Sequence, residues 1–242
     1  MPLTPTATIL VLNYNGRKHL EGCLPSLAQL DYPNASVTVV DNGSTDGSLE
    51  YLRRAHPGVG VLALGSNRGF APAYNIAVRQ SASDVVVLLN NDTRVEPAWL
   101  SSLVDVLERH DAAAAASCML DWDGRHIDFV GGLPTFVGHA WQVDHGRPVG
   151  RAYAEQPLLF GCGGSLAIRR EAFLEVGGFD DDYFVYFEDL DLGWRMTLAG
   201  LPTMLAPDAI TYHRLHGTSS RFPFGRAVTR SRNPAETSSA SH

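Results

Sequence analysis

The feature that most constrains the fold of this sequence is the alternation of short apolar stretches with segments of helical periodicity. The apolar stretches lie at Ala7–Asn13, Ser36–Asp41, Val59–Leu64 and Val85–Leu89. Continuous apolar runs this short are typical of strands that are buried on both faces of a parallel sheet. Because helical segments separate them, we predict an α/β fold with a mostly parallel sheet covered by helices on both sides.

Apolar residues three and four positions apart, together with residues that begin or end helices, locate the helical segments. The predicted helices are Leu20–Leu30, Leu49–Ala55, Phe70–Arg79, a helix that begins at Pro97, Arg170–Val176 and Leu190–Ala199. Pro97 is expected as a first helical residue because its ring fixes a helical φ. In the last of these helices, Leu190, Trp194 and Leu198 are expected to form one apolar face.

The alternation stops after Met119. Asp121–Gln156 is rich in Gly, Asp and His without a clear period, and is interpreted as an insertion. Further strands are expected over Gly163–Arg169, Pro202–Ala206 and Ala209–Tyr212. We expect one domain over residues 1–218, with halves at about 1–119 and 120–218, and a disordered tail over 219–242, where Ser and Arg dominate.

Charge and cysteine content exclude several classes of protein. The net charge is −7, from 26 acidic and 19 basic residues, so the basic footprint of a nucleic-acid-binding protein is absent. Three widely spaced cysteines form no disulfide framework and no zinc motif, which indicates a reducing compartment. No signal peptide and no apolar run of bilayer length is evident. We therefore expect a cytoplasmic protein.

Polar residues follow each of the four predicted strands. The strand ends are Asn13-Tyr14-Asn15-Gly16, Asp41-Asn42-Gly43-Ser44, Ser66-Asn67-Arg68-Gly69 and Asn90-Asn91-Asp92-Thr93. Loop preference alone would supply some Asn and Asp, but ligands of parallel sheets bind beyond the carboxyl ends of the strands. We expect Asp41 and Asp92 to leave neighbouring strands on the same rim and to enclose one pocket together with Asp189.

Common nucleotide and hydrolase motifs are missing from the sequence. There is no G-x-G-x-x-G after the first strand and no G-x-x-x-x-G-K-[ST], which argues against a dinucleotide site and excludes a P-loop. H-E-x-x-H and G-x-S-x-G do not occur either. These absences remove the commonest signals for metalloproteases and α/β-hydrolases.

Two acidic positions are candidates for chemistry. Asp92 follows a buried strand, where its carboxylate can bind a hard divalent cation that neutralises a diphosphate. Asp92 lies too far before the next helix to cap it, and Glu96 is better placed to interact with the dipole of that helix. Glu188 and Asp189 open the Leu190–Ala199 helix. From local sequence, Asp189 fits a helix cap and a rigid general base equally well.

Six blocks of the sequence, in order, resemble glycosyltransferase family 2, which has the GT-A fold, and most closely its bacterial rhamnosyltransferase-type members. The blocks are ILVLNYNG, VVDNGSTDGS, NRGFAPAYN, VVLLNNDTRVEP, FGCGGSLAIRREAFLEVGGFDDDYFVYFEDLDLGWR and YHRLHGTSS. They span roughly residues 7–220. Many relatives continue into a longer C-terminal part, whereas this chain runs through Arg226, Arg230 and Arg232 into a low-complexity tail.

The resemblance implies roles for individual residues. The donor nucleotide sugar is expected to contact Asn13, Tyr14, Asp41, Asn67, Gly69, Asn75 and Asn91. Asp92 matches the last acid of the family's D-x-D motif and, with His213 or His216, is expected to hold Mg2+ or Mn2+; Asn90 replaces the motif's first Asp. Asp189 matches the general base, with Glu188 beside it. Gly163 and Gly164 match a loop that faces the transferred sugar and the acceptor.

The function implied is the transfer of a sugar from a UDP- or dTDP-linked donor to a hydroxyl of a glycan or glycolipid, with inversion at the anomeric carbon. The region after Met119 would form the acceptor side, and peripheral contact with the inner face of the membrane is a further expectation. Two alternatives stay open. One is a catalytically silent nucleotide-sugar-binding module, and the other is a sugar-phosphate nucleotidyltransferase, which NYNGRKH matches poorly.

Overall fold

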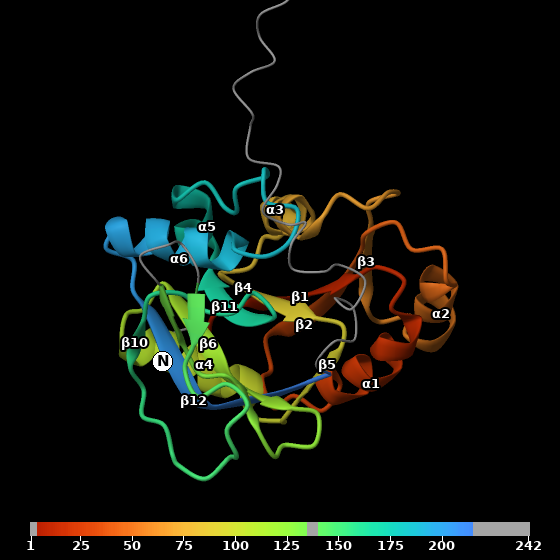
Figure 1. Cartoon of the computed structure of the whole chain (residues 1–242). Coiled ribbons are helices and arrows are strands. Elements are labelled where there is room, and N and C mark those ends of the chain that lie inside the picture. The colour runs from red at the N-terminus through yellow and green to blue at the C-terminus, as the bar shows by residue number, and fades with distance from the viewer. Residues whose placement is uncertain (1–3, 135–139, 215–242) are drawn as a thin grey trace, which may run out of the picture.

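A mixed sheet forms the centre of the computed structural model, which describes residues 4–134 and 140–214 (Figure 1). Within these residues the strand order is β10-β12-β6-β11-β4-β1-β2-β3. The central strand β1 (Ala7–Asn13) runs parallel to β2 (Ala35–Asp41) and to β4 (Val85–Asn90), and β2 runs parallel to β3 (Gly60–Ala63). The predicted parallel arrangement of the first half is confirmed.

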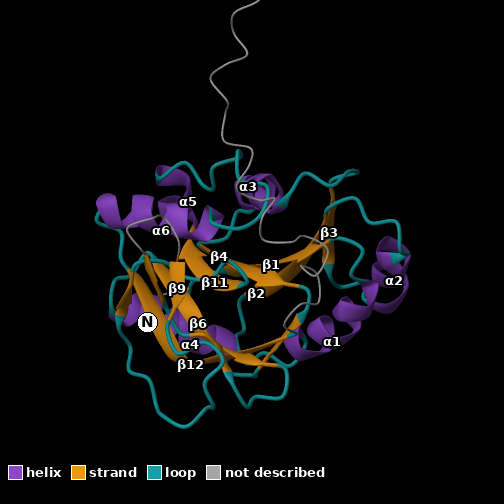
Figure 2. Ribbon diagram, viewed as in Figure 1, coloured by secondary structure: helices purple, strands orange, loops and turns teal. Residues whose placement is uncertain are grey.

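Helices cover both faces of the sheet (Figure 2). On one face lie α1 (Arg17–Leu27), α2 (Ser48–Ala55) and α4 (Trp99–Arg109), and on the other lie α3 (Phe70–Gln80), α5 (Arg170–Glu175) and α6 (Glu188–Leu198). Alternate residues of β1 and β4 point into the two cores: Ile9 and Val87 into the first, Leu10 and Val86 into the second. This double burial explains the continuous apolar runs.

The second half of the chain adds an antiparallel part to the sheet. β11 (Ser165–Arg169) lies antiparallel to β4 and to β6 (Ala114–Asp121), and β12 (Thr203–His213) runs parallel to β6. Sequence periodicity missed β6 because its first residues are alanines, which have low strand propensity. The two strands expected after Pro202 are one strand, β12, whose register shifts between Ala206 and Ile210.

Short strands occupy the remaining segments. They are β5 (Thr93–Val95), β7 (Ile127–Phe129), β8 (Gly132–Pro134), β9 (Ala140–Gln142) and β10 (Pro157–Leu158). β5 pairs with β12 and β7 with β6, whereas β8 and β9 form a separate ribbon. The segment after Met119, which has no clear period in the sequence, is thus attached to the main sheet by short-strand pairing.

Two predicted details are wrong, and one of two open interpretations is excluded. Pro97 lies in the turn before α4, which begins at Trp99. α6 begins at Glu188, so Asp189 lies inside its first turn and does not cap it. The expected apolar face of α6 is largely exposed, with Trp194 at 50% and Leu198 at 74%.

The buried face of α6 is formed instead by Leu192, Gly193 and Met196. A Cβ atom on Gly193 would meet the Cα of Phe160 at 2.7 Å and the carbonyl oxygen of Leu159 at 2.5 Å. The helix therefore approaches the Leu159–Phe160 backbone through a residue that has no side chain. A search for apolar side chains at helical spacing cannot detect such a contact.

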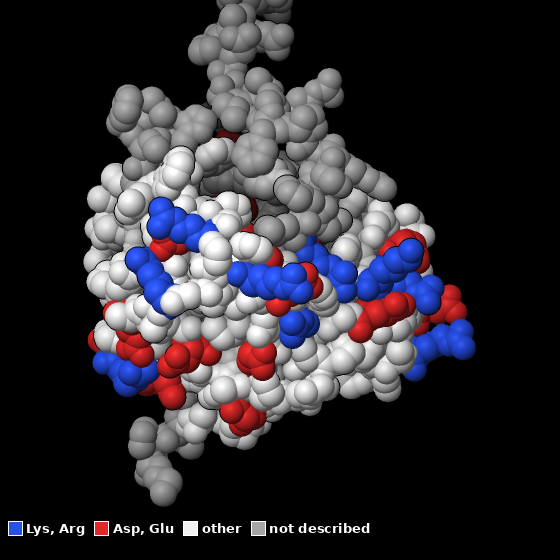
Figure 3. All heavy atoms as spheres, turned by 60° about the horizontal axis from the view of Figure 1, so that its bottom comes forward, with Lys and Arg blue, Asp and Glu red and all other residues white. Residues whose placement is uncertain are grey.

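The surface of the protein shows no large area of one charge sign on the face seen in Figure 3, where basic and acidic side chains of the described residues are interspersed. Among the described residues, no helix combines the length and apolar character needed to cross a membrane. His216 and the expected tail over 219–242 lie outside the described residues.

A matched pair of substitutions tests the orientation of α6. Leu192→Ala removes a side chain that is 1% exposed and is expected to lower the free energy of unfolding by about 2–5 kcal/mol. Leu198→Ala, the same change at a position that is 74% exposed, is expected to change it by less than about 0.5 kcal/mol. Urea denaturation measures both, and equal losses would contradict this packing.

Candidate active site

The ends of the central strands meet in one row. Asn13 at the end of β1 pairs with Asp41 at the end of β2, and Leu12 pairs with Asn90 at the end of β4. The expectation that Asp41 and Asp92 leave neighbouring strands is wrong, because β1 lies between β2 and β4. Asn13 therefore stands between the two acidic strand ends.

A buried hydrogen-bond network joins these ends. The amide nitrogen of Asn13 donates to Asp41 Oδ2 and to Ser44 Oγ, both at 3.1 Å. Its amide oxygen accepts from Asn91 Nδ2 at 2.7 Å, and Asp41 Oδ1 accepts from the backbone N–H of Ser44 at 3.0 Å. Asn13, Asp41 and Asn91 are at most 3% exposed. The network fixes the loops that follow β1, β2 and β4 relative to one another.

The loop between β3 and α3 is attached to the same edge. Asn42 Nδ2 donates to Asn67 Oδ1 and to the carbonyl oxygen of Gly69, both at 3.0 Å. Asn67 Oδ1 also accepts from the N–H of Gly69 at 3.0 Å. Gly69 has φ +91°, and a Cβ there would lie 2.8 Å from the ring of Phe184. Tyr14, 41% exposed, stands at the surface of this edge.

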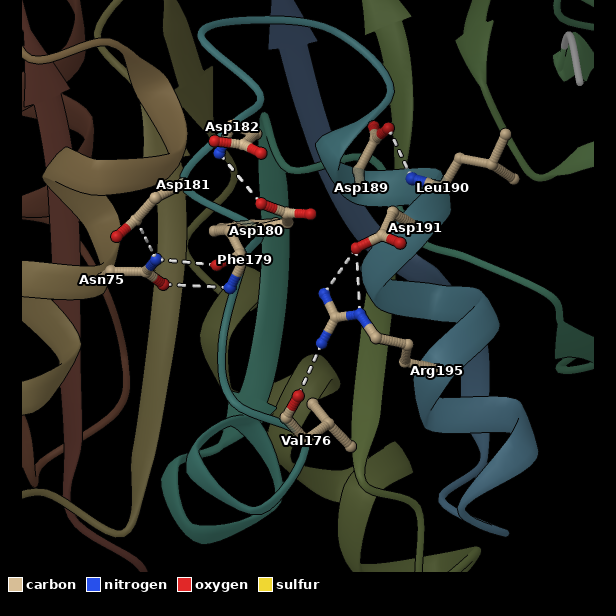
Figure 4. Close-up of polar contacts among 10 residues, drawn as sticks. All are labelled: Asn75, Val176, Phe179, Asp180, Asp181, Asp182, Asp189, Leu190, Asp191 and Arg195. Carbon is tan, nitrogen blue, oxygen red and sulfur yellow. Dashed lines mark hydrogen bonds and ion pairs between the residues drawn. The ribbon is translucent and has the colours of Figure 1, made fainter. Parts of the chain in front are cut away.

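Asn75 lies apart from the strand ends. It is buried in α3, and its amide is hydrogen-bonded to Phe179 and Asp181, in the segment between α5 and α6 (Figure 4). The structure thus brings Asn13, Asp41 and Asn91 into one network and Asn67 and Gly69 into a second one. Asn75 contacts a different element.

Asp92 and His213 meet at the other side of this edge. β5 directly follows Asp92 and pairs with β12, which places His213 opposite Thr93. His213 Nε2 lies 3.3 Å from Asp92 Oδ1. On its other side, His213 Nδ1 donates to Asp128 Oδ2 at 2.7 Å. Burial lowers the pKa of His213, but its hydrogen bonds to Asp128 and Asp92 outweigh that effect and raise the pKa to about 10.

Asp128, which the sequence analysis missed, orients the histidine ring. It lies in β7, is 7% exposed, and comes from the region that shows no clear period in the sequence. The one local signal is a charged residue between apolar neighbours, Ile127 and Phe129, in a short strand-like run. Carboxylates that hold the second nitrogen of a histidine fix its tautomer and point the first nitrogen at a metal.

The pair Asp92–His213 fits a divalent cation when the Nε2 proton of His213 is released, as metal binding to a histidine requires. Adjacent ligands of an octahedral ion with bonds of about 2.1 Å lie roughly 3 Å apart, close to the 3.3 Å measured here. No group of three or more His, Cys, Asp or Glu side chains arranged as a metal site occurs in residues 4–134 and 140–214. Such a pair would leave the other coordination positions to phosphate oxygens and water, which is how proteins bind Mg2+ beside nucleotides.

Glu188 and Asp189 begin α6 after two residues in the left-handed region, Tyr186 and Phe187, with φ +72° and +69°. Glu188 is 5% exposed, and its Oε2 has no hydrogen-bond partner among the described residues. Burial and the neighbouring charge of Asp189 raise the pKa of Glu188. Burial also raises the pKa of Asp189, against hydrogen bonds from the backbone that lower it. A carboxylate of raised pKa in a dry setting is suited to accept a proton.

Gly163 and Gly164 connect this acidic pair to the strand ends. A Cβ on Gly163 would lie 3.9 Å from that of Asp189 and 3.0 Å from the ring of Phe70. A Cβ on Gly164 would lie 3.1 Å from Asn90 Nδ2, and the carbonyl oxygen of Gly164 accepts from the N–H of Asn90 at 3.0 Å. The start of α6 therefore reaches the end of β4 through two glycines.

The buried carboxylate of Glu188 predicts a pH-dependent stability. Because its folded-state pKa lies above the unfolded value, ionisation destabilises the folded chain as the pH rises. Glu188→Gln is expected to raise the melting temperature relative to the wild type at about pH 9 and to leave it nearly unchanged at about pH 4, below the unfolded pKa. Glu175→Gln, at an exposed position, is the control for thermal denaturation. A stabilisation that does not depend on pH would contradict the assignment.

Comparison with protein families gives a match over residues 8–177 to the model described as "Glycosyl transferase family 2". A curated relative, "N-acetylglucosaminyl-diphospho-decaprenol L-rhamnosyltransferase" of Mycobacterium tuberculosis, is 31% identical over 244 residues, which cover 89% of this chain and 78% of that protein. "Rhamnosyltransferase WbbL" of Escherichia coli is 26% identical over 67% of this chain and 65% of its own length.

Solved structures share the fold. "GalNAc-T7 with UDP, GalNAc and Mn2+" matches with a TM-score of 0.73 at 17% identity, over 88% of this chain and 44% of that one. A mannosyltransferase from Pyrobaculum calidifontis "in complex with GDP-Man and Mn2+" matches with a TM-score of 0.67 at 22% identity, over 90% and 59% of the two chains. The fold is therefore GT-A, as the resemblance predicted, and the chain belongs to glycosyltransferase family 2.

Proposed function

We propose that this chain transfers a sugar from a UDP- or dTDP-linked donor to a hydroxyl group of a glycan or glycolipid acceptor, with inversion at the anomeric carbon. Membership of the family and the rhamnosyltransferases among its relatives support this class of reaction. The observation that carries the proposal is the Asp92–His213 pair on the edge that Gly164 contacts through Asn90, with Gly163 beside it next to Asp189.

The donor nucleotide is assigned to the polar strand ends. Tyr14 supplies an exposed surface for a base or ribose, and Asn67 and Gly69 border the same edge. Asp41, Asn13 and Asn91 are already hydrogen-bonded to one another, so their contribution includes holding the loops around the nucleotide. This arrangement is preorganised, which lowers the entropy cost of binding.

The leaving diphosphate is assigned to Asp92 and His213, which would hold Mg2+ or Mn2+. When bound, such an ion neutralises the negative charge that develops on the leaving group. Asp128 keeps the His213 ring turned toward Asp92 through the Nδ1 hydrogen bond. The Mn2+ present in both structural neighbours supports a divalent cation in this position.

The acceptor hydroxyl is assigned to Asp189, which takes its proton as the new glycosidic bond forms. The raised pKa of Asp189 makes this carboxylate a better base than one in water, and Glu188 beside it adds negative charge when it ionises. The sugar passes from the donor in a single displacement, since Asp189 acts on the acceptor and attacks no carbon. Gly163, which packs closely against Phe70, lies beside Asp189 at this position.

Two substitutions separate the roles of the acidic side chains. Asp92→Asn is expected to weaken Mn2+-dependent binding of the nucleoside diphosphate by about tenfold or more, measured by calorimetry. Asp189→Asn is expected to leave that binding within about twofold and to lower kcat by at least about a hundredfold. If the wild type binds UDP, dTDP and GDP equally poorly with and without Mn2+, the proposed function fails. Binding without donor turnover would favour the silent module.

The stereochemistry of the product provides a further test. A single displacement driven by one base predicts that the anomeric configuration of the transferred sugar is inverted relative to the donor. Proton NMR of the freshly formed product, with the coupling constant of its anomeric proton, distinguishes the two outcomes. A product that keeps the donor's configuration would require a nucleophile that the proposal does not contain.

A further inference from the structure

The side chain of Asn75 is a buried polar group whose hydrogen bonds all go to one loop. It lies in α3 and is 1% exposed. Its Nδ2 donates to the carbonyl oxygen of Phe179 at 2.8 Å and to Asp181 Oδ1 at 2.7 Å, and its Oδ1 accepts from the N–H of Phe179 at 2.9 Å (Figure 4). Both N–H groups and the oxygen are therefore occupied by protein partners.

The loop that Asn75 holds connects α5 to α6 and covers residues 176–187. A second contact fixes its far part to the same helix, because the N–H of Phe70 donates to the carbonyl oxygen of Phe184 at 2.8 Å. Phe179 also packs its ring against Phe70 and Phe173, with centroids 5.8 and 5.4 Å apart. The loop is thus attached to α3 near both of its ends.

The end of this loop is strained. Tyr186 and Phe187 both have positive φ, which costs a residue with a side chain roughly 1–2 kcal/mol, and such a conformation persists only where the surroundings impose it. These two residues immediately precede Glu188 and Asp189. Arg195 fixes the following turns of α6, since it donates to Asp191 Oδ2 at 2.7 Å and to the carbonyl oxygen of Val176 at 2.6 Å (Figure 4).

We propose that Asn75 is a positioning residue, whose amide latches the 176–187 loop to α3 and thereby holds Asp189 where it meets the acceptor hydroxyl. The inference rests on the proposed function of Asp189 as the base. It differs from the donor contact that the family resemblance implies for Asn75, because both N–H groups of the amide and its oxygen already bond to the 176–187 loop. Since α3 follows directly on Asn67 and Gly69, the latch also joins the donor edge to the acceptor edge.

A reciprocal exchange tests the latch. Asn75→Asp replaces the donor to Asp181 by a second carboxylate, so that two negative charges face each other across a contact that is now 2.7 Å long. Adding Asp181→Asn restores a donor opposite an acceptor and returns the net charge to that of the wild type. Asp181→Asn alone keeps an amide oxygen as acceptor for Asn75, and it is expected to behave like the wild type.

The expected result separates turnover from donor binding. Asn75→Asp is expected to lower kcat by about tenfold or more, as misplacement of a catalytic group does, while the donor KM and the nucleotide dissociation constant stay within about twofold. The double variant is expected to recover part of the lost kcat, because it restores the contact with residue 181 but not the donation to the carbonyl oxygen of Phe179. Asn34→Asp, the same exchange at an exposed position, is the control for the chemical change itself. An equal loss of donor affinity in Asn75→Asp would overturn the proposal in favour of a donor contact.

Hydrogen–deuterium exchange gives a readout that does not need activity. Asn75→Asp is expected to speed exchange in residues 176–187 and the double variant to slow it again, with α1 as an internal reference. Unchanged exchange in a folded variant, or a double variant that recovers neither protection nor kcat, would overturn the latch. A different outcome would separate the two proposals: the double variant restores protection of the loop, but the wild type neither binds nucleotide nor transfers sugar. That result would refute the proposed function and leave the structural role of Asn75 supported.

Discussion

The hydrogen bonds of Asn13 set the geometry on which the rest of the site depends. Its side chain lies at the end of the central strand, is fully buried, and joins Asp41 and Ser44 on one side to Asn91 on the other. A buried amide without partners is costly, so the loops after β2 and β4 can take few other positions. The position of Asp92 next to Asn91 follows from this network.

The parallel half of the fold could be predicted from the sequence because strands that are buried on both faces are short, continuous apolar runs. Each of β1, β2 and β4 is a short apolar run with Asn or Asp at its end. The antiparallel half has a weaker sequence pattern. Alanines in β6 carry little strand signal, and the contact of α6 through Gly193 cannot be seen in a pattern of apolar side chains.

The candidate site divides in the same way. The strand-end residues and the pair Glu188–Asp189 could be named from motifs, since their chemistry is local in sequence. Asp128 could not, because its role arises from pairing between β7 and β6 and from the approach of His213 on β12. The use of the Asn75 amide was also out of reach, because a motif identifies a residue but not whether its hydrogen bonds go to a ligand or to the chain.

The antiparallel strand β11 places Gly163 and Gly164, and with them the start of α6, beside the ends of the parallel strands. β11 runs beside β4 in the opposite direction, so the residues that precede it, Gly163 and Gly164, lie at the carboxyl end of β4. If β11 ran parallel to β4, the carboxyl ends of both strands would lie at the same edge of the sheet. The loop that precedes β11 would then lie at the opposite edge. Gly164 packs on Asn90 and Gly163 on Phe70, so a side chain at either position would have to displace that neighbour. Close packing at the two glycines is therefore compatible with the proposed base and the proposed cation site belonging to one reaction centre.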